Sequence, residues 1–495
     1  MTSLAIAAPT QLSVDAALSI AADGGNAVDA TLGALLVDLV VNPGVVSPGA
    51  GAFITVEPVE GDAVTIDGYC AMPGLGRDRN RPISTRVASM EYGGGITTVV
   101  GHGSVAVPGV YAAVESTWER FGSLPWQRLF DGAIGVAADG YPVPDASSYY
   151  FQYSHLDAYG WQDESYRALH DEHGAVRSVI KHAHLSETLQ RIAELGADDF
   201  YRGETARRIV DEMEAGNGLI TERDLAEYQA LDRIPIHVQV GDWAIATNPA
   251  PAVGGAAMAA MVRIAESLNA WESVEQMAEI QAAVLGYRQL MPAIDLEAEV
   301  AEFLDRSATG LHALTGSPST IQLSAVGGDG LAVSVTASGG YGSGLIVPGT
   351  GMWMNNCLGE VELSPRGLFS VEPGSRLLSN MAPTVAKGPG GEVLAIGSPG
   401  ASRITTAIMQ VLGKLTALNE TLSRAVESPR FHIDVDNSDP TFVHEPGIEP
   451  PDTYPSRSFD GLNMYFGGVQ AAHRLADGTL EAVADSRRAS VAATM

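Results

Sequence analysis

The spacing of hydrophobic residues changes repeatedly between the period of a helix and the period of a strand. Residues 13–25 have helical spacing that ends at two glycines, and Asn26 stands where the cap of a second helix, over 27–41, is expected. Two alternating segments then predict strands, at 52–58 and 63–69. The N-terminal part of the chain is therefore expected to be helical up to these strands.

The interleaving continues to the C-terminus. Helical spacing predominates from about 105 to 230, residues 234–248 have the pattern of a hairpin, and helices are expected over 254–268 and near 275–305. Beyond Thr320 the pattern predicts strands at 320–326, 331–337 and 392–398, helices at 403–418 and 422–429, and a last region of strands and loops that includes 441–445 and 469–475.

Helices and strands thus alternate in both halves of the chain. Neither a Pro/Ser-rich linker nor an internal repeat separates them, which indicates a mixed α/β (α+β) fold in one body. The loop over 306–319 is the best candidate for a boundary, because it combines glycine, proline and serine directly before a predicted strand.

The charge balance narrows the class of partner. The chain has 59 acidic against 29 basic residues and a formal net charge of −30, so it has no basic stripe that could neutralise phosphates. We therefore expect no nucleic-acid partner and no binding to anionic membranes, but a small-molecule substrate. An acidic substrate would need local arginines or backbone N–H groups.

Targeting and membrane signals are weak. Residues 31–46 are the most apolar early stretch, but Asp38 and Asn42-Pro43 interrupt it, which favours a buried helix over a membrane span. No lysine or arginine precedes Arg77, so the basic region of a signal peptide is missing and a cytoplasmic protein is expected.

Cys70 and Cys357 are the only cysteines. Two cysteines cannot form a disulfide framework, and the absence of a CxxC motif or a Cys/His cluster argues against structural zinc. We expect two reduced core thiols, no metal and no cofactor.

Thr320 opens a predicted hairpin abruptly, straight after a loop. The common interpretation is a β-branched residue at the start of a strand. The alternative is that the peptide bond before Thr320 is cut, so that its hydroxyl gains its own α-amine, with a pKa of about 7.7–8.0, as an adjacent base. The same hydroxyl could make the cut by an N-to-O acyl shift.

Two other segments carry candidate chemistry. GSPGASR (397–403) lies between a predicted strand and a predicted helix, where exposed N–H groups could bind an anion or an oxyanion. A plain tight turn is the structural alternative. Ser379 and Asn380 lie within SRLLSNMAPT (375–384), and a capped loop is the common reason for such residues.

In order along the chain, these segments resemble the γ-glutamyltransferase (γ-glutamyltranspeptidase) family. AADGGNAVDATLGALLV (21–37) is similar to a signature near the family's start, and the resemblance continues through 105–143, 196–204 and 216–228. TIQLSAVGGDGLAVSVT (320–336) resembles the segment that begins with the family's nucleophile. Further blocks follow in the family's order: VPGTGMWMNN (347–356), RLLSNMAPT (376–384), GSPGASRI (397–404), AVESPRFH (425–432) and FGGVQA (466–471).

The resemblance implies an N-terminal-nucleophile hydrolase with a four-layer αββα sandwich. The precursor would cleave itself between Ser319 and Thr320 into a large subunit, 1–319, and a small subunit, 320–495, which form an intertwined heterodimer. Thr320 would form an acyl-enzyme and pass the acyl group to water or an amine.

The resemblance also assigns supporting residues. The backbone N–H groups of Gly400 and Ala401 would form the oxyanion hole, since they match the family's Gly-Gly pair. Thr336 or Ser338 corresponds to a second hydroxyl that orients the nucleophile, and the sequence leaves both open.

The sequence departs from the family where the family holds glutamate. Tyr69 stands at the position of an arginine, Cys357 replaces a glutamate, Glu360 is retained at an aspartate position, and Ser379-Asn380 replaces a pair of serines. A tyrosine cannot give the bidentate, charge-assisted contact of a guanidinium group. Losing a charged recognition pair typically costs about 2–5 kcal/mol of binding free energy, unless an arginine such as Arg376 or Arg403 replaces it.

We therefore expect a self-processing threonine hydrolase or acyltransferase that acts on a non-standard, amino-acid-derived substrate. Such an enzyme could cleave amide or carbon–carbon bonds in secondary metabolism, including antibiotic biosynthesis, as some members of the superfamily do. Two alternatives stay open: an authentic γ-glutamyltranspeptidase or glutathione hydrolase, and an uncleaved, inactive homologue that acts as a binding protein.

Overall fold

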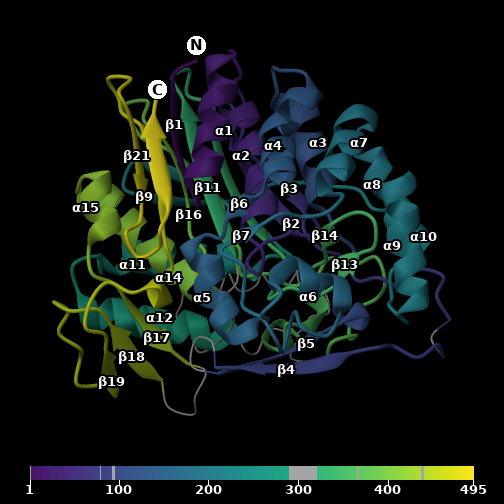
Figure 1. Cartoon of the computed structure of the whole chain (residues 1–495). Helices are drawn as coiled ribbons and strands as arrows, with labels where there is room; N and C mark the ends of the chain where they lie inside the picture. The colour runs from purple at the N-terminus through teal and green to yellow at the C-terminus, as the bar shows by residue number, and fades with distance from the viewer. Residues whose placement is uncertain (1, 79, 92–94, 289–319, 365–366, 436–439) are drawn as a thin grey trace.

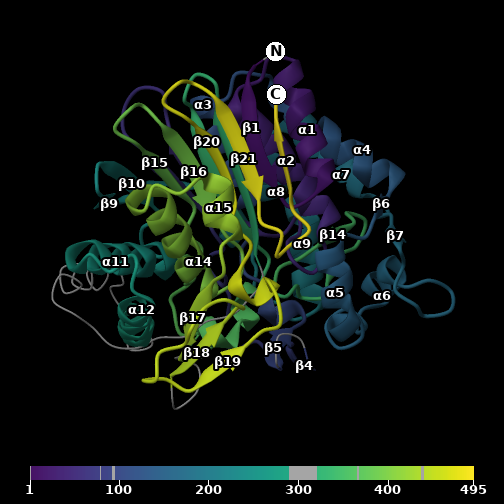
Figure 2. The same cartoon turned by 90° about the vertical axis from the view of Figure 1, so that its left-hand side faces the viewer.

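A computed structural model describes residues 2–495 except 79, 92–94, 289–319, 365–366 and 436–439. Two stacked β-sheets form its centre, and helices cover the outer face of each sheet (Figure 1, Figure 2). The N- and C-terminal strands pair with each other, so the two ends of the chain lie side by side (Figure 1). This arrangement confirms the expected mixed fold and its αββα layering.

The first sheet has seven strands in the order β22-β1-β11-β12-β2-β3-β8. All its neighbouring strands whose pairing is described run antiparallel, and the central strands are buried on both faces, which suits their content of valine, isoleucine and threonine. Its strands are β1 (Leu4–Ala8), β2 (Gly51–Glu57), β3 (Val64–Gly68), β8 (Leu231–Arg233), β11 (Ile321–Gly327), β12 (Ala332–Ser338) and β22 (Val491–Thr494).

The second sheet has six strands in the order β21-β20-β16-β15-β10-β9 and packs on the first, with β11 against β16 and β20. A buried polar row crosses the interface: the Gln322 side-chain amide donates to Ser334 Oγ (3.0 Å), which donates to the carbonyl of Ile396 (2.9 Å). The strands are β9 (Ile236–Val240), β10 (Trp243–Thr247), β15 (Thr384–Lys387), β16 (Val393–Gly397), β20 (Gln470–Arg474) and β21 (Leu480–Ala484).

Helices α1 (Gln11–Ala22), α2 (Ala27–Val41), α3 (Val110–Phe121) and α4 (Asp131–Asp139) lie on one side of the sandwich, and α11 (Val253–Leu268), α12 (Val274–Arg288), α14 (Arg403–Leu412) and α15 (Leu422–Glu427) on the other (Figure 2). Every residue of α2 is buried, and Asn26 caps it as the sequence predicts. A helix that is apolar on all sides packs within a core. Among the described residues, no helix has the length and apolar character that crossing a membrane requires.

The remaining elements lie beside the helices of the first sheet, where residues 185–195 pack against α4, or around one end of the sandwich. They are β4 (Arg86–Met90), β5 (Ile96–Val100), β6 (Tyr141–Pro142), α5 (Asp145–Ser154), α6 (Asp163–Leu169), β7 (Val179–Ile180), α7 (Leu185–Leu195), α8 (Asp198–Arg202), α9 (Glu204–Ala215), α10 (Glu222–Ala226), β13 (Ile346–Val347), β14 (Met352–Trp353), β17 (Phe431–Asp434), β18 (Thr441–His444) and β19 (Ser456–Ser458).

The structure corrects two sequence predictions. The expectation of a purely helical N-terminal part is wrong for β1, because this strand is buried on both faces and shows no alternation. The helix predicted over 403–418 ends as an α-helix at Leu412 and continues as a π-helical turn, where Gly413 packs against the ring of Trp271. The predicted boundary at 306–319 and the helix beyond 288 lie outside the described residues.

A buried network of charges holds the turn between β21 and β22. The Arg487 guanidinium contacts Asp485 Oδ1 (3.0 Å) and Glu445 Oε1 (2.7 Å), and Arg430 contacts Asp485 Oδ2 (2.6 Å). All four side chains are buried. Burial raises the pKa of Asp485, but the two guanidinium groups hold it below its usual value. The network thereby fixes the segment that carries Arg488.

We predict that Arg487→Met destabilises the protein by about 3–5 kcal/mol, because it leaves two carboxylates buried without this cation. Urea unfolding followed by circular dichroism measures the change. Arg207→Met, which breaks an exposed contact with Glu204, is the matched control and should leave the unfolding midpoint unchanged. Equal midpoints for the two variants would show that the network does not hold the fold.

Candidate active site

Thr320 lies directly before β11, at one end of the seven-stranded sheet, and only 6% of its surface is exposed. In β11 and β12, Ile321 pairs with Ala337, so the next position places Ser338 opposite Thr320. Ser338 in turn pairs with Gly51 of β2. The register thus aligns Thr320, Ser338 and Gly51 across three adjacent strands.

The same row continues to Tyr69. Ala52 pairs with Gly68, so the next position places Tyr69 opposite Gly51. Adjacent strands are about 4.8 Å apart, which puts Tyr69 roughly 14 Å from Thr320 along this end of the sheet. The sheet therefore brings the expected nucleophile and the expected substrate-binding position to one end of the molecule.

The two candidates for the orienting hydroxyl differ in position. Thr336 Oγ1 donates to the side-chain oxygen of Gln322 (2.7 Å), within the polar row between the sheets. Ser338 Oγ accepts the N–H of Gly340 (3.1 Å) and lies at the sheet end, opposite Thr320. The geometry favours Ser338 as the neighbour of the expected nucleophile.

The turn after β16 contains two buried residues, Gly400 and Ala401, whose backbone N–H groups precede a helix. Gly400 has φ of +124° and Ala401 has φ of +62°, and α14 begins two residues later. Across the described residues, neither N–H donates a hydrogen bond within the protein. A Cβ on Gly400 would lie 2.8 Å from Gly467 Cα, so only glycine fits this position. Two N–H groups without an acceptor at the start of a helix favour the binding of an anion.

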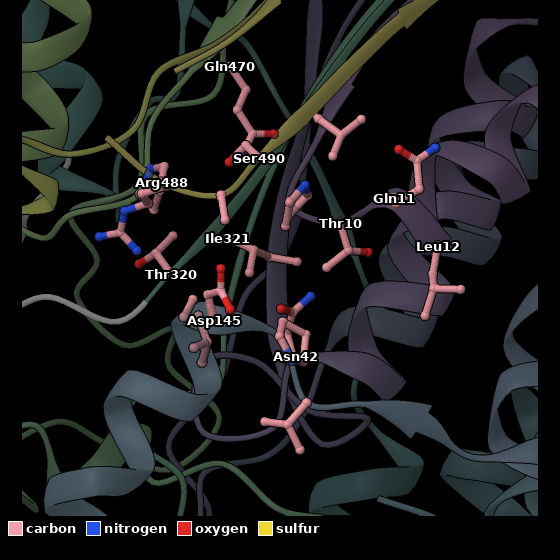
Figure 3. A pocket seen from close by; sticks show the side chains of 18 of the residues that line it. Thr10, Gln11, Leu12, Asn42, Asp145, Thr320, Ile321, Gln470, Arg488 and Ser490 are labelled. Carbon is pink, nitrogen blue, oxygen red and sulfur yellow. The ribbon is translucent and has the colours of Figure 1, made fainter. Parts of the chain in front are cut away.

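A cavity of about 320 Å³ connects these features, since Thr320 and Pro399 both line it. Figure 3 shows Thr320 with the side chains of Arg488 and Asp145 beside it, whereas Gln11 and Leu12 line the far side. The charged side chains in the lining of the cavity therefore lie next to Thr320.

Arg488 was not among the residues singled out from the sequence. Its Nε donates to the carbonyl of Gly467 (3.4 Å), and its side chain reaches the cavity from the turn between β21 and β22. An arginine near the C-terminus gives no local signal, because only the pairing of the terminal strands brings it to Thr320.

Tyr69 and Cys357 lie together in a closed apolar cluster. Only 2% of Tyr69 is exposed, and its ring stacks on Phe53 with 5.3 Å between the centroids. Burial, followed by the neighbouring Cys357 and Glu360, raises the pKa of the Tyr69 hydroxyl. The adjacent Cys70 thiol, together with burial, raises the pKa of Cys357. Tyr69 and Cys357 are therefore uncharged near neutral pH.

Glu360, Ser379 and Asn380 are also buried. A Cβ on Gly340 would lie 3.2 Å from Glu360 Oε1, so this carboxylate closely approaches the backbone just after β12. Ser379 Oγ accepts the N–H of Met381 (3.1 Å), as a capped loop would require. In the described part of the chain, Asn380 Oδ1 accepts no hydrogen bond.

The arginines that could replace the missing clamp are held elsewhere. Arg376 Nε donates to Asp67 Oδ1 (3.1 Å), and its guanidinium lies 4.4 Å from the ring centre of Tyr228. Arg403 Nε donates to the carbonyl of Tyr465 (3.1 Å) and lies over that ring. Each arginine already has its acceptor, so neither takes the place of a guanidinium at Tyr69.

Comparisons with known proteins agree with this geometry. The model of the family described as gamma-glutamyltranspeptidase matches residues 13–495. A glutathione hydrolase proenzyme from Pseudomonas aeruginosa is 29% identical over 469 residues, covering 86% of this chain and 82% of the relative. An acylase ACY 1 proenzyme from a Pseudomonas species is 27% identical over 440 residues, covering 82% and 78%.

A similar fold occurs in the crystal structure of cephalosporin acylase from Bacillus halodurans, with a TM-score of 0.79 over 99% of this chain and 96% of that one. At 23% identity this likeness concerns the fold alone. The family match, in contrast, spans almost the whole sequence and includes Thr320 and the turn at Gly400. The chain therefore belongs to the gamma-glutamyltranspeptidase family of N-terminal-nucleophile hydrolases and acyltransferases.

Proposed function

We propose that the chain is a precursor that cuts itself before Thr320, giving a large subunit, 1–319, and a small subunit, 320–495, that stay together as a heterodimer. The position of Thr320 at the start of a central strand supports this, and so do relatives named proenzymes. Ser319, on the other side of the expected cut, lies outside the described residues. The Thr320 hydroxyl would attack the preceding carbonyl, and the shift of the acyl group from nitrogen to oxygen would free the α-amine of Thr320. Hydrolysis of the resulting ester would then free the Thr320 hydroxyl and separate the two chains.

In the processed enzyme the same hydroxyl attacks the substrate's acyl carbon. The new α-amine takes its proton, and Ser338 orients the nucleophile from the neighbouring strand. The N–H groups of Gly400 and Ala401 stabilise the oxyanion, because they stand before α14 without protein acceptors in the described chain. The amine then protonates the leaving group, and water or an acceptor amine resolves the acyl-enzyme.

The substrate is proposed to differ from an ordinary γ-glutamyl donor. The observation that carries this is the closed cluster of Tyr69 and Cys357 in the row that begins at Thr320. An α-carboxylate placed there would lose its hydration without gaining a cation. An acyl group derived from an amino acid but without that carboxylate fits better, and either an amide or a carbon–carbon bond could be cleaved. A role in secondary metabolism stays a prediction.

An authentic glutathione hydrolase is the second candidate. It is favoured by the 29% identical relative of that name and by the retained Glu360, whose carboxylate could hold an ammonium group. An uncleaved binding protein is the third candidate, and the mass of the expressed protein distinguishes it from the other two.

We predict that the purified protein contains two chains and that the smaller one begins at Thr320. Thr320→Ala should remain a single chain, because it lacks the hydroxyl, whereas Thr320→Ser should still be cut, more slowly. Intact mass spectrometry reads all three proteins. A wild-type chain that stays whole would refute the proposed processing.

We predict weak activity on γ-glutamyl-p-nitroanilide. Loss of a charged recognition pair costs about 2–5 kcal/mol, so kcat/KM should be about 30-fold to several thousand-fold below that of the Pseudomonas aeruginosa relative in the same assay. Release of nitroaniline measures it. Turnover equal to that of the relative, abolished by Thr320→Ala, would instead establish the second candidate.

We predict opposite effects at the two positions of the oxyanion turn. Gly400→Ala should lower kcat at least about 100-fold, since its Cβ meets Gly467 and displaces the N–H groups. Ala401→Gly should keep kcat within a few-fold and raise stability by about 1 kcal/mol, because glycine relieves the left-handed backbone. Kinetics on the best substrate found, together with urea unfolding, test both. Full activity of Gly400→Ala would show that these N–H groups do not stabilise the oxyanion.

A further inference from the structure

The only two cysteines of the chain, 287 positions apart, lie next to each other in the apolar cluster with Tyr69. Both side chains are buried, with exposed fractions of 0% for Cys70 and 3% for Cys357. The two side chains belong to one packed cluster of buried residues, which also contains Tyr69, and the Cys70 thiol raises the pKa of Cys357. Neither is bonded to another cysteine in this structure.

The backbone around both cysteines is tied to the same two segments. Cys70 lies against Gly51, where a Cβ would stand 3.0 Å from its sulfur, and Asn355 donates to the carbonyl of Gly49 (2.7 Å). Cys357 N–H donates to the side-chain oxygen of Asn355 (3.0 Å). The start of β2 therefore contacts both cysteine-bearing segments.

The second shared segment is Ala106–Val107. Ala106 exchanges hydrogen bonds with the Asn355 side chain (3.0 and 2.9 Å). Val107 exchanges backbone hydrogen bonds with Ala71, the residue after Cys70 (3.1 and 2.9 Å). Two independent sets of hydrogen bonds thus hold Cys70 and Cys357 at a fixed separation, as a pair of thiols must be held to oxidise together.

We propose that Cys70 and Cys357 are an oxidation site whose disulfide joins the large and small subunits covalently. Hydrogen peroxide is the oxidant: one thiolate attacks a peroxide oxygen to give a sulfenic acid and water, and the second thiol displaces a second water to form the S–S bond. Two thiols and one peroxide thus yield one disulfide and two waters. The reaction is slow, because both sulfur atoms are buried and hydrogen peroxide reaches them only with difficulty.

The joining of two chains rests on the proposed cut before Thr320, because Cys70 lies in 1–319 and Cys357 in 320–495. The Cys357 thiol lies near both the Tyr69 hydroxyl and the Cys70 thiol. The disulfide would commit the Cys357 sulfur to Cys70. It would thereby fix the segment that carries Glu360 to the end of β3.

The test exposes the processed wild-type protein to excess hydrogen peroxide for several hours and separates it under denaturing conditions without reductant. The two chains should then migrate as one species of the full chain's size and separate again on addition of dithiothreitol. Cys70→Ser and Cys357→Ser should give separate chains under every condition. Chains that separate after peroxide treatment of the wild type, or cysteines that take up oxygen atoms individually, would overturn the proposal.

Uncut Thr320→Ala protein provides a readout that does not depend on processing. After the same treatment, digestion should give one linked peptide pair containing Cys70 and Cys357, lighter by two hydrogen atoms than the two free peptides together. Separate Cys70 and Cys357 peptides, with both thiols still open to alkylation after denaturation, would contradict the disulfide. Failure of the wild type to be cut would contradict only the proposed function.

Discussion

The antiparallel register of β11, β12, β2 and β3 is the constraint on which the site depends. It fixes Thr320, Ser338, Gly51 and Tyr69 in one row at one end of the sheet. A shift of one residue between β11 and β12 would turn the hydroxyls of Thr320 and Ser338 to opposite faces. The polar row of Gln322 and Ser334 between the two sheets helps to fix this register, because the Gln322 side chain hydrogen-bonds to both Ser334 and Thr336 of β12.

The placement of positive charge distinguishes the cavity at Thr320 from the cluster at Tyr69. The chain has few basic residues, and those near the site serve the fold: Arg376 holds Asp67, while Arg430 and Arg487 hold Asp485. Arg488 is the guanidinium that lines the Thr320 cavity. The cation thus reaches Thr320 from the C-terminal turn, whereas the position at Tyr69 is apolar and closed. The binding of a negatively charged group near Thr320 therefore depends on which acceptors hold each arginine side chain.

The sequence predicted most of the fold because most helices and strands have clear periodicity and caps. Asn26 and the fully buried helix after it are examples. It missed β1, since a short strand buried on both faces has no alternation. Ordered motifs predicted Thr320, Tyr69 and Cys357, but the choice between Thr336 and Ser338 required the register. Arg488 and the contact of Cys70 with Cys357 could not be predicted, because pairing between distant segments creates both.

The central claim is that the Thr320 hydroxyl accepts an acyl group from the substrate and that this acyl group carries no α-carboxylate. Trapping the acyl-enzyme and measuring the mass of the small subunit by mass spectrometry tests this claim most directly. The protein is offered, in parallel, γ-glutamyl-p-nitroanilide and p-nitroanilides of uncharged, amino-acid-derived acyl groups, and each sample is quenched with acid. The account predicts an adduct on the chain that begins at Thr320 from an uncharged donor and little from the γ-glutamyl donor. A dominant γ-glutamyl adduct on Thr320 would contradict it.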